Sequence, residues 1–258
     1  MKKLALFGNN ITNSLSPSIY HQIALKLNLL LSYQLKQVSH VNDIDVTGLD
    51  GFNITSPFKN KFFTKTFPIS FKPDPVSEET QAPNTYKLEG NKYFIYNTDY
   101  YGIKSSFLER KISVRNLKVL ILGSGDVSKT LIYFLKKNDT SKIKIFNRSI
   151  RKEAYYSVFN INKLNLQNEE FDLLISTIPT DALKNYPLIS NYSFHEKIVF
   201  DLSYQINDSI LMQKEQAQII DGLSMLIWQA IRNIEIWFDI KIDLKRELKE
   251  EIYQKVKP

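Results

Sequence analysis

The feature that most constrains the fold is an apolar run that ends in a glycine-rich turn. Residues 119–122 are apolar at every position and lead directly into Gly123-Ser124-Gly125, and Leu131 and Leu135 follow at helical spacing. A strand, a tight turn and a helix in this order are typical of a dinucleotide-binding unit, in which backbone at a helix N-terminus approaches a pyrophosphate. The glycine pattern alone is a weak signal, and its position between strand and helix strengthens it.

Three more apolar runs, at residues 143–146, 173–176 and 198–202, alternate with helical stretches. Strands that alternate with helices favour a parallel sheet wound by right-handed crossovers. We therefore predict an α/β fold with a Rossmann-type doubly wound domain over residues 103–222.

The flanking parts of the chain show a different pattern. Strands are predicted at residues 3–7, at 31–35 and in a short segment that ends at residue 55, and a hairpin is predicted over residues 85–96. Ser16 is expected to cap a helix that has Pro17 in its first turn. Residues 67–83 hold four prolines and are predicted to be a surface connection. After residue 225 the chain is expected to be helical.

Composition excludes several kinds of chemistry. The chain has no cysteine, and its three histidines lie far apart in sequence, so we expect neither thiolate chemistry nor a metal site. The net charge of +7 comes from scattered lysines without a basic block, which argues against a nucleic-acid partner. The apolar run at residues 4–7 is too short for a signal peptide or a membrane span, so a cytoplasmic location is expected.

The end of the strand after the glycine turn indicates which dinucleotide is bound. Enzymes that use NAD place a carboxylate there to hold the ribose 2′-hydroxyl. This chain has Asn147-Arg148-Ser149, followed by Arg151 and Lys152. A guanidinium and small hydroxyls would hold a 2′-phosphate, so NADP is favoured over NAD.

Polar side chains of the first hundred residues could form a substrate site. Ser14 and Ser16 present hydroxyls at a helix start, where a carboxylate would be stabilised. Lys59 can donate a proton and polarise a carbonyl, and Asp99 could pair with it and orient hydroxyl groups. Which of the two carries the proton is left open by the sequence.

With these motifs in place, the chain resembles the shikimate dehydrogenase family over nearly its whole length. The shared motifs are Ser-x-Ser-Pro at 14–17, Gly-x-Asn-x-Thr-x-Pro-x-Lys at 51–59, Ala-x-Asn-Thr at 82–85, Asn-Thr-Asp at 97–99, the glycine turn, Asn-Arg-Ser at 147–149, and Asp-Gly-Leu-x-Met-Leu-x-x-Gln-Ala at 221–230. The resemblance implies a two-domain enzyme with an active-site cleft. It would reduce 3-dehydroshikimate to shikimate reversibly with NADPH, a step of aromatic amino acid and chorismate biosynthesis. Residues 1–102, completed by helices at 223–258, would form the substrate domain, and residues 103–222 the NADP domain.

The resemblance also implies roles for single residues. Ser14, Ser16 and Tyr204 would hold the substrate carboxylate with Thr55 beside them, and Lys59, Asn84, Asp99 and Gln229 would hold the ring hydroxyls. The cofactor would contact Gly123, Ser124, Gly125, Asp126, Val127, Ser128, Asn147, Arg148, Ser149, Lys152, Thr177, Gly222 and Met225.

Some positions depart from the family pattern. Asp126 stands where the phosphate loop usually has a fourth small residue, and a carboxylate there would weaken cofactor binding unless it points outward or caps the helix. Tyr20 replaces a residue that is often histidine. Three alternatives stay open: an enzyme that also uses quinate or NAD, a non-catalytic dinucleotide-binding paralogue, and, most weakly, a nucleic-acid binder. The protein is expected to act as a monomer or homodimer.

Overall fold

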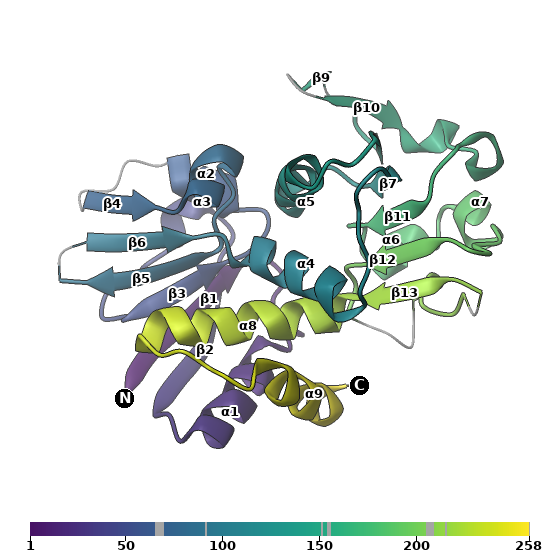
Figure 1. The fold of residues 1–258 in the computed structure, drawn as a ribbon. Coiled ribbons are helices and arrows are strands. Elements are labelled where there is room, and N and C mark those ends of the chain that lie inside the picture. Colours follow the sequence, from purple (N-terminus) through teal and green to yellow (C-terminus); the bar gives the residue numbers. More distant parts are fainter. Residues whose placement is uncertain are drawn as a thin grey trace. The chain divides into compact units, whose positions relative to one another are not determined.

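The computed structural model describes residues 1–64, 70–90, 92–150, 152–153, 156–204, 209–214 and 216–257 (Figure 1). The chain forms two compact units. Unit 1 comprises Met1–Gly102 and Leu226–Lys257, and unit 2 comprises Ile103–Met225. The first boundary coincides with the one drawn from the sequence, and the second lies three residues further along the chain.

Unit 1 contains a six-stranded mixed sheet. Its strands are β1 (Lys2–Gly8), β2 (Leu31–Gln37), β3 (Gly51–Ile54), β4 (Ser70–Pro73), β5 (Thr85–Glu89) and β6 (Lys92–Tyr96). They lie in the order β2-β1-β3-β5-β6-β4. Strand β5 is antiparallel to both of its neighbours, whereas β1 is parallel to β2 and β3.

The two faces of this sheet carry different side chains because residues alternate along each strand. Phe52 stacks on Tyr86 on one face, with Phe62 of α2 (Lys59–Thr64) edge-on against both rings. The other face meets α1 (Ser16–Leu27) and α8 (Gly222–Phe238), whose Tyr20 and Trp237 rings are in contact. Helix α9 (Lys245–Val256) packs on α1.

Unit 2 contains seven strands, which are β7 (Lys118–Leu122), β8 (Lys142–Asn147), β9 (Lys152–Glu153), β10 (Tyr156–Asn160), β11 (Leu173–Ser176), β12 (Ile198–Asp201) and β13 (Gln218–Asp221). Six of them are parallel in the order β10-β8-β7-β11-β12-β13, and β9 adds antiparallel to β10. Counted along the chain, this is the 3-2-1-4-5-6 order of a Rossmann sheet, so the predicted fold class is confirmed.

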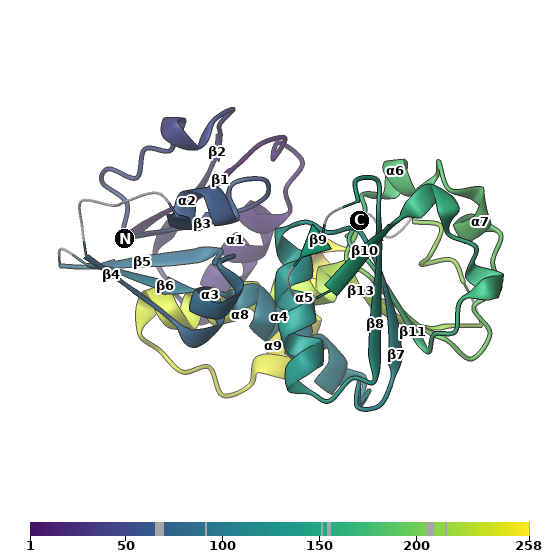
Figure 2. The same ribbon diagram turned by 90° about the horizontal axis from the view of Figure 1, so that it is seen from above.

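Helices cover both faces of the unit 2 sheet. Figures 1 and 2 show α5 (Asp126–Lys137) on one face and α6 (Thr180–Leu183) with α7 (Pro187–Ser190) on the other. Leu120 and Leu122 belong to the core on the α6–α7 side, together with Leu183 and Ile189. On the other side Phe107 of α4 (Thr98–Glu109) stacks on Phe134 of α5.

The structure corrects three local predictions. Residues 67–83 are not a plain surface connection, because they contain β4 and α3 (Pro75–Thr80); residues 65–69 lie outside the described part. Ser16 is the first residue of α1 rather than its N-cap, which is Leu15 without a side-chain hydrogen bond. Strands β9, β10 and β13 were not predicted.

None of the helices in the described ranges is both long enough and apolar enough to cross a bilayer.

Candidate active site

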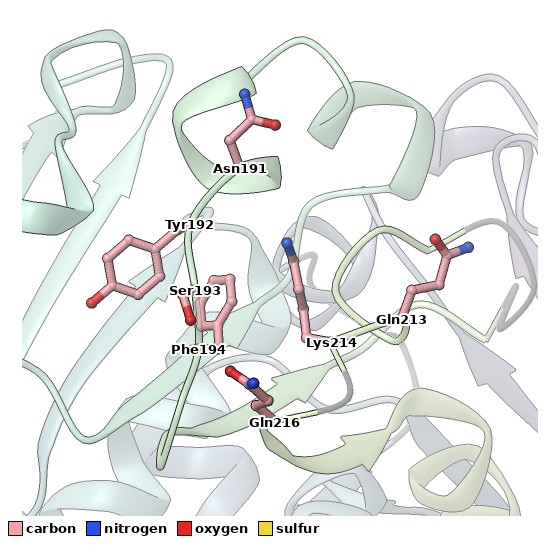
Figure 3. Close-up of a pocket in the computed structure, with 7 residues that line it drawn as sticks. All are labelled: Asn191, Tyr192, Ser193, Phe194, Gln213, Lys214 and Gln216. Atoms are coloured by element: carbon pink, nitrogen blue, oxygen red, sulfur yellow. The ribbon is translucent and has the colours of Figure 1, made fainter.

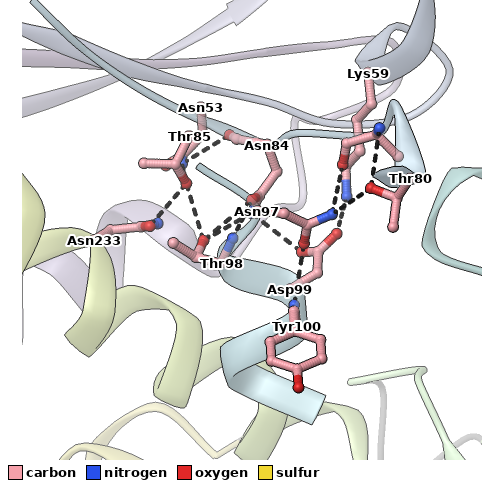
Figure 4. A network of polar contacts seen from close by, with 11 residues as sticks. Asn53, Lys59, Thr80, Asn84, Thr85, Asn97, Thr98, Asp99, Tyr100 and Asn233 are labelled. Carbon is pink, nitrogen blue, oxygen red and sulfur yellow. Dashed lines mark hydrogen bonds and ion pairs between the residues drawn. The ribbon is translucent and has the colours of Figure 1, made fainter. Parts of the chain in front are cut away.

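The ion pair between Lys59 and Asp99 is the centre of the candidate site in unit 1. Lys59 begins α2, just after the turn that follows β3, and Asp99 lies in the first turn of α4. The Lys59 Nζ contacts Asp99 Oδ2, and the two residues are only 6% and 4% exposed (Figure 4). Folding therefore brings together an ammonium and a carboxylate that are 40 positions apart in sequence.

Asn84 completes this group. Its Nδ2 lies 3.1 Å from Asp99 Oδ1 and 3.0 Å from Thr98 Oγ1, and its Oδ1 accepts a 2.7 Å hydrogen bond from the Thr98 amide. Both oxygens of Asp99 thus have a donor, one from Asn84 and one from Lys59. These two contacts hold the carboxylate in one orientation. It can accept a further hydrogen bond only at the lone pairs that they leave unused.

The predicted carboxylate-binding hydroxyls lie in the same unit. Ser14 Oγ is 3.2 Å from Ser16 Oγ and accepts a 3.3 Å hydrogen bond from the Ser16 amide at the start of α1. Thr55 follows β3, and its methyl group fills the space that a side chain at Gly8 would need. Gln229 lies half-buried on α8.

Tyr204 belongs to unit 2, after β12, unlike the other predicted substrate ligands. It is half-buried, and that burial raises the pKa of its hydroxyl above the ordinary value, so the phenol stays protonated at neutral pH.

The glycine turn of unit 2 lines a pocket of about 220 Å³. The pocket is at the carboxyl ends of β7, β8 and β11, which is where dinucleotides bind in sheets of this strand order. Six of the predicted cofactor residues line it, and these are Gly123, Ser124, Gly125, Asn147, Arg148 and Thr177. Four residues that were not predicted also line it: Ile178, Pro179, Ala182 and Tyr186. The signal that could have indicated them is that this segment follows β11, the parallel strand beside β7.

Six more of the predicted cofactor residues are described and do not line this pocket. Asp126, Val127 and Ser128 form the first turn of α5, and Ser149 is exposed after β8. Gly222 and Met225 begin α8 within unit 2, whereas the side chain of Lys152 and the whole of Arg151 lie outside the described part.

The pocket fits the pyrophosphate and 2′-phosphate of NADP. Gly123 has φ +95°, a conformation that favours glycine. Gly125 caps α5, and the space where its side chain would project is open, so a phosphate can approach the helix N-terminus. Arg148 is exposed and lines the pocket after β8, and Asn147 ends that strand where a carboxylate would indicate NAD instead.

Asp126, which departs from the phosphate-loop pattern of the family, places a negative charge next to the proposed pyrophosphate position. Its side chain is 15% exposed and lies 4.0 Å from Lys129 in the same helix. The partial positive charge at the N-terminus of α5 stabilises the Asp126 carboxylate. A bound phosphate would be stabilised by the same partial charge, so the two anions would share it.

The described residues hold no candidate metal site, and two pockets besides the one at the glycine turn are lined by residues that were not predicted. No cluster of three or more His, Asp or Glu side chains in the part of the chain that the structure describes could hold a metal ion. A second pocket of about 350 Å³ is shown in Figure 3; it is lined by residues 191–194 and by Gln213, Lys214 and Gln216, none of which is a predicted site residue.

Comparison with known proteins supplies the deciding observation. Residues 6–85 match the model of the shikimate dehydrogenase substrate binding domain. The shikimate dehydrogenase (NADP(+)) of Clostridium perfringens is 30% identical over 100% of this chain and 99% of its own length, and that of Caldicellulosiruptor saccharolyticus is 31% identical over 99% and 98%. The chain belongs to the shikimate dehydrogenase family.

Solved shikimate dehydrogenases have the same fold. The crystal structure of shikimate dehydrogenase 1 from Peptoclostridium difficile aligns with a TM-score of 0.83 at 26% identity, over 100% of this chain and 98% of that one. The enzyme of Thermus thermophilus, solved with NADP(H) and shikimate, aligns with a TM-score of 0.80 at 19% identity over 99% and 100%.

Proposed function

We propose that this protein is an NADP-dependent shikimate dehydrogenase, which reduces 3-dehydroshikimate to shikimate reversibly for chorismate and aromatic amino acid biosynthesis. The observation that carries the proposal is the buried ion pair of Lys59 and Asp99 with the Asn84 amide beside it. Reducing a ketone requires a hydride at the carbon and a proton at the oxygen. The bound NADPH supplies the hydride, and the proton must come from a side chain.

Lys59 is the proposed proton donor. One of its three N–H groups faces Asp99, which leaves donors for a carbonyl oxygen. The positive charge also stabilises the negative charge that develops on that oxygen, in a place from which water is largely excluded. Asp99 orients the ammonium and can accept a hydrogen bond from a ring hydroxyl of the substrate.

The two units have separate proposed roles. Unit 1 would bind the substrate: Ser14, Ser16 and Thr55 hold its carboxylate, and Asn84 and Gln229 hold its hydroxyls. Unit 2 would bind NADP at the glycine turn, with Arg148 on the 2′-phosphate and the N-terminus of α5 on the pyrophosphate. Tyr204 keeps its predicted role as a ligand of the carboxylate. The proposal includes a cytoplasmic location and action as a monomer or homodimer.

One assay tests the proposal directly. Formation of the reduced cofactor, NADPH or NADH, is followed with shikimate and with quinate, each with NADP and with NAD. We expect turnover with shikimate and NADP and little turnover with the other pairs, because Arg148 can bind a 2′-phosphate and Asn147 stands where an NAD enzyme would carry an acid. Equal rates with quinate or with NAD would favour the broader enzyme, and no turnover with any pair would favour a non-catalytic paralogue.

A further inference from the structure

Four buried side chains close a ring of hydrogen bonds inside unit 1. Tyr20 lies on α1, Asn53 on β3, Thr85 on β5 and Asn233 on α8, and none is more than 6% exposed. The successive contacts are Tyr20 Oη–Asn53 Oδ1 at 3.1 Å, Asn53 Nδ2–Thr85 Oγ1 at 2.9 Å, Thr85 Oγ1–Asn233 Oδ1 at 2.8 Å and Asn233 Nδ2–Tyr20 Oη at 2.6 Å. Part of this ring is visible in Figure 4.

A single backbone carbonyl fixes the direction of every hydrogen bond in the ring. The Asn53 amide group lies 3.1 Å from the carbonyl oxygen of Asn84, which can only accept, so the nitrogen of Asn53 must face it. The oxygen of Asn53 then accepts from Tyr20, and the Tyr20 oxygen accepts from the amide nitrogen of Asn233. The Asn233 oxygen is left facing Thr85, whose only hydroxyl proton is therefore used inside the ring.

This assignment continues from Thr85 to the candidate active site. Thr85 Oγ1 is 2.9 Å from Thr98 Oγ1 and has no proton left, so Thr98 must donate. The Thr98 oxygen then accepts from the amide nitrogen of Asn84, and the second hydrogen of that nitrogen is directed at Asp99 Oδ1. The Thr98 backbone N–H, which donates to Asn84 Oδ1, requires the same orientation of Asn84 independently.

We propose that Thr85 is a positioning residue for the reaction. Its hydroxyl accepts from Thr98, which keeps the Thr98 oxygen free to accept from Asn84 and so holds the Asn84 amide against Asp99. Without the Thr85 hydroxyl, the Thr98 proton can turn to Asn84 Oδ1, which is only 3.2 Å away. The Asn84 amide then keeps the Thr98 backbone N–H but loses the second of the two contacts that fix its orientation, so Asp99 is held less firmly beside Lys59. The proposal rests on the proposed function, because it assigns Thr85 to that reaction.

The decisive variants are Thr85→Val, which keeps the shape and removes the hydroxyl, and Thr85→Ser, which restores it. We expect Thr85→Val to lower kcat with shikimate and NADP about tenfold or more, because small errors in placing reacting groups are costly, with a smaller change in KM. Thr85→Ser should recover most of that loss. Thr140→Val is the matched control, since it removes a hydroxyl of unit 2 that donates to the Val114 carbonyl, away from the candidate active site. Its kcat should equal that of the parent protein.

A second measurement separates this inference from the proposed function. Hydrogen exchange of the Asn84 side-chain amide, followed by NMR without substrate, should be slow in the parent, faster in Thr85→Val and slow again in Thr85→Ser. If the parent turns over no shikimate but the exchange pattern holds, the proposed function fails while the hydrogen-bond assignment stands.

An active parent whose Thr85→Val variant is folded and keeps its kcat within about twofold would overturn the role of Thr85, since positioning effects of this kind are larger. If Thr85→Val does not fold, Tyr20→Phe opens the ring at the opposite side. The Tyr20→Phe variant should have a measurably lower kcat than the parent, although the decrease should be smaller than the one caused by loss of the Thr85 hydroxyl. An unchanged kcat in Tyr20→Phe would also overturn the proposal.

Discussion

The hydroxyl of Thr177 occupies the space in which Gly123 would carry a side chain. Thr177 Oγ1 is 2.9 Å from the carbonyl of Leu122 and 3.3 Å from Ser128 Oγ, so it ties the end of β11 to both sides of the glycine turn. The turn is therefore held from the neighbouring strand as well as by its own backbone.

Gly123→Ala should disrupt both the fold of the turn and cofactor binding, because a Cβ would collide with Thr177 and the positive φ would be strained. We expect a loss of about 1–3 kcal/mol in unfolding free energy and a raised Kd for NADP, measured by calorimetry. Gly90→Ala is the control, since Gly90 has φ +59° but open space around it, and it should leave the Kd unchanged. If Gly123→Ala bound NADP normally, the turn would not be the phosphate site.

Lys59→Met should lower kcat by roughly 10²–10⁴, the usual contribution of a positioned proton donor. Lys87→Met is a matched control because Lys87 is also a buried lysine of unit 1, paired with Glu89 and Asp239. The control should alter stability and leave kcat near that of the parent. Equal losses of kcat in the two variants would mean that any buried lysine of this unit has the same effect.

Arg148→Ala should raise the KM for NADP on the order of tenfold and change the KM for NAD little, since a charged hydrogen bond contributes about 1.5–3 kcal/mol. Arg115→Ala removes an exposed arginine that does not line the cofactor pocket, and both KM values should stay constant. Steady-state kinetics with the two cofactors gives the comparison. A parallel rise for NADP and NAD would exclude a contact with the 2′-phosphate.

Tyr86→Phe should stabilise the protein. The Tyr86 hydroxyl is buried and has no hydrogen-bond partner among the described residues, so its removal relieves a desolvation cost of about 1–3 kcal/mol. Tyr20→Phe should do the opposite, because it leaves the Asn233 amide without its acceptor. Denaturant unfolding of the two variants checks the difference in sign, and destabilisation by both would contradict it.

Stability should fall at alkaline pH. Burial raises the pKa of Tyr20, Tyr33 and Tyr86 above the ordinary value, so these phenols stay protonated in the folded state where they would ionise in the unfolded chain. The unfolded state then binds fewer protons than the folded one, and the unfolding free energy decreases as pH rises above about 10. Unfolding curves between pH 8 and pH 11 measure this, with a shallower decrease expected for Tyr86→Phe. A free energy that does not change with pH would refute the assignment.

The sequence predicts best what is encoded locally. The apolar run before Gly123 and the periodic apolar positions after it lie within a few residues of each other, so the strand, turn and helix could all be expected. Strand β4 was missed because it ends in Pro73 within a segment that holds four prolines, and such a segment indicates a loop. Proline is tolerated in this strand because β4 lies at the edge of the sheet.

The site was predictable in part for the same reason. Lys59 and Asp99 each stand in a short motif, whereas the contact between Thr85 and Asn233 spans 148 positions and follows from no local pattern. The hint available was chemical: Asn233 is a polar residue within an apolar helix, and a buried amide needs partners. Only the folded sheet and helices show which partners these are.

The discontinuity of unit 1 has a consequence for biosynthesis. A ribosome makes β1 to β6 first, yet Trp237, which lies over Gly51 and donates to the Tyr86 carbonyl, is added only after the whole of unit 2 has been translated. Until then α1 alone covers this face of the sheet, while unit 2 already has all of its strands and can fold first. The last helices to be synthesised, α8 and α9, therefore complete unit 1, although unit 1 is the unit whose synthesis began first.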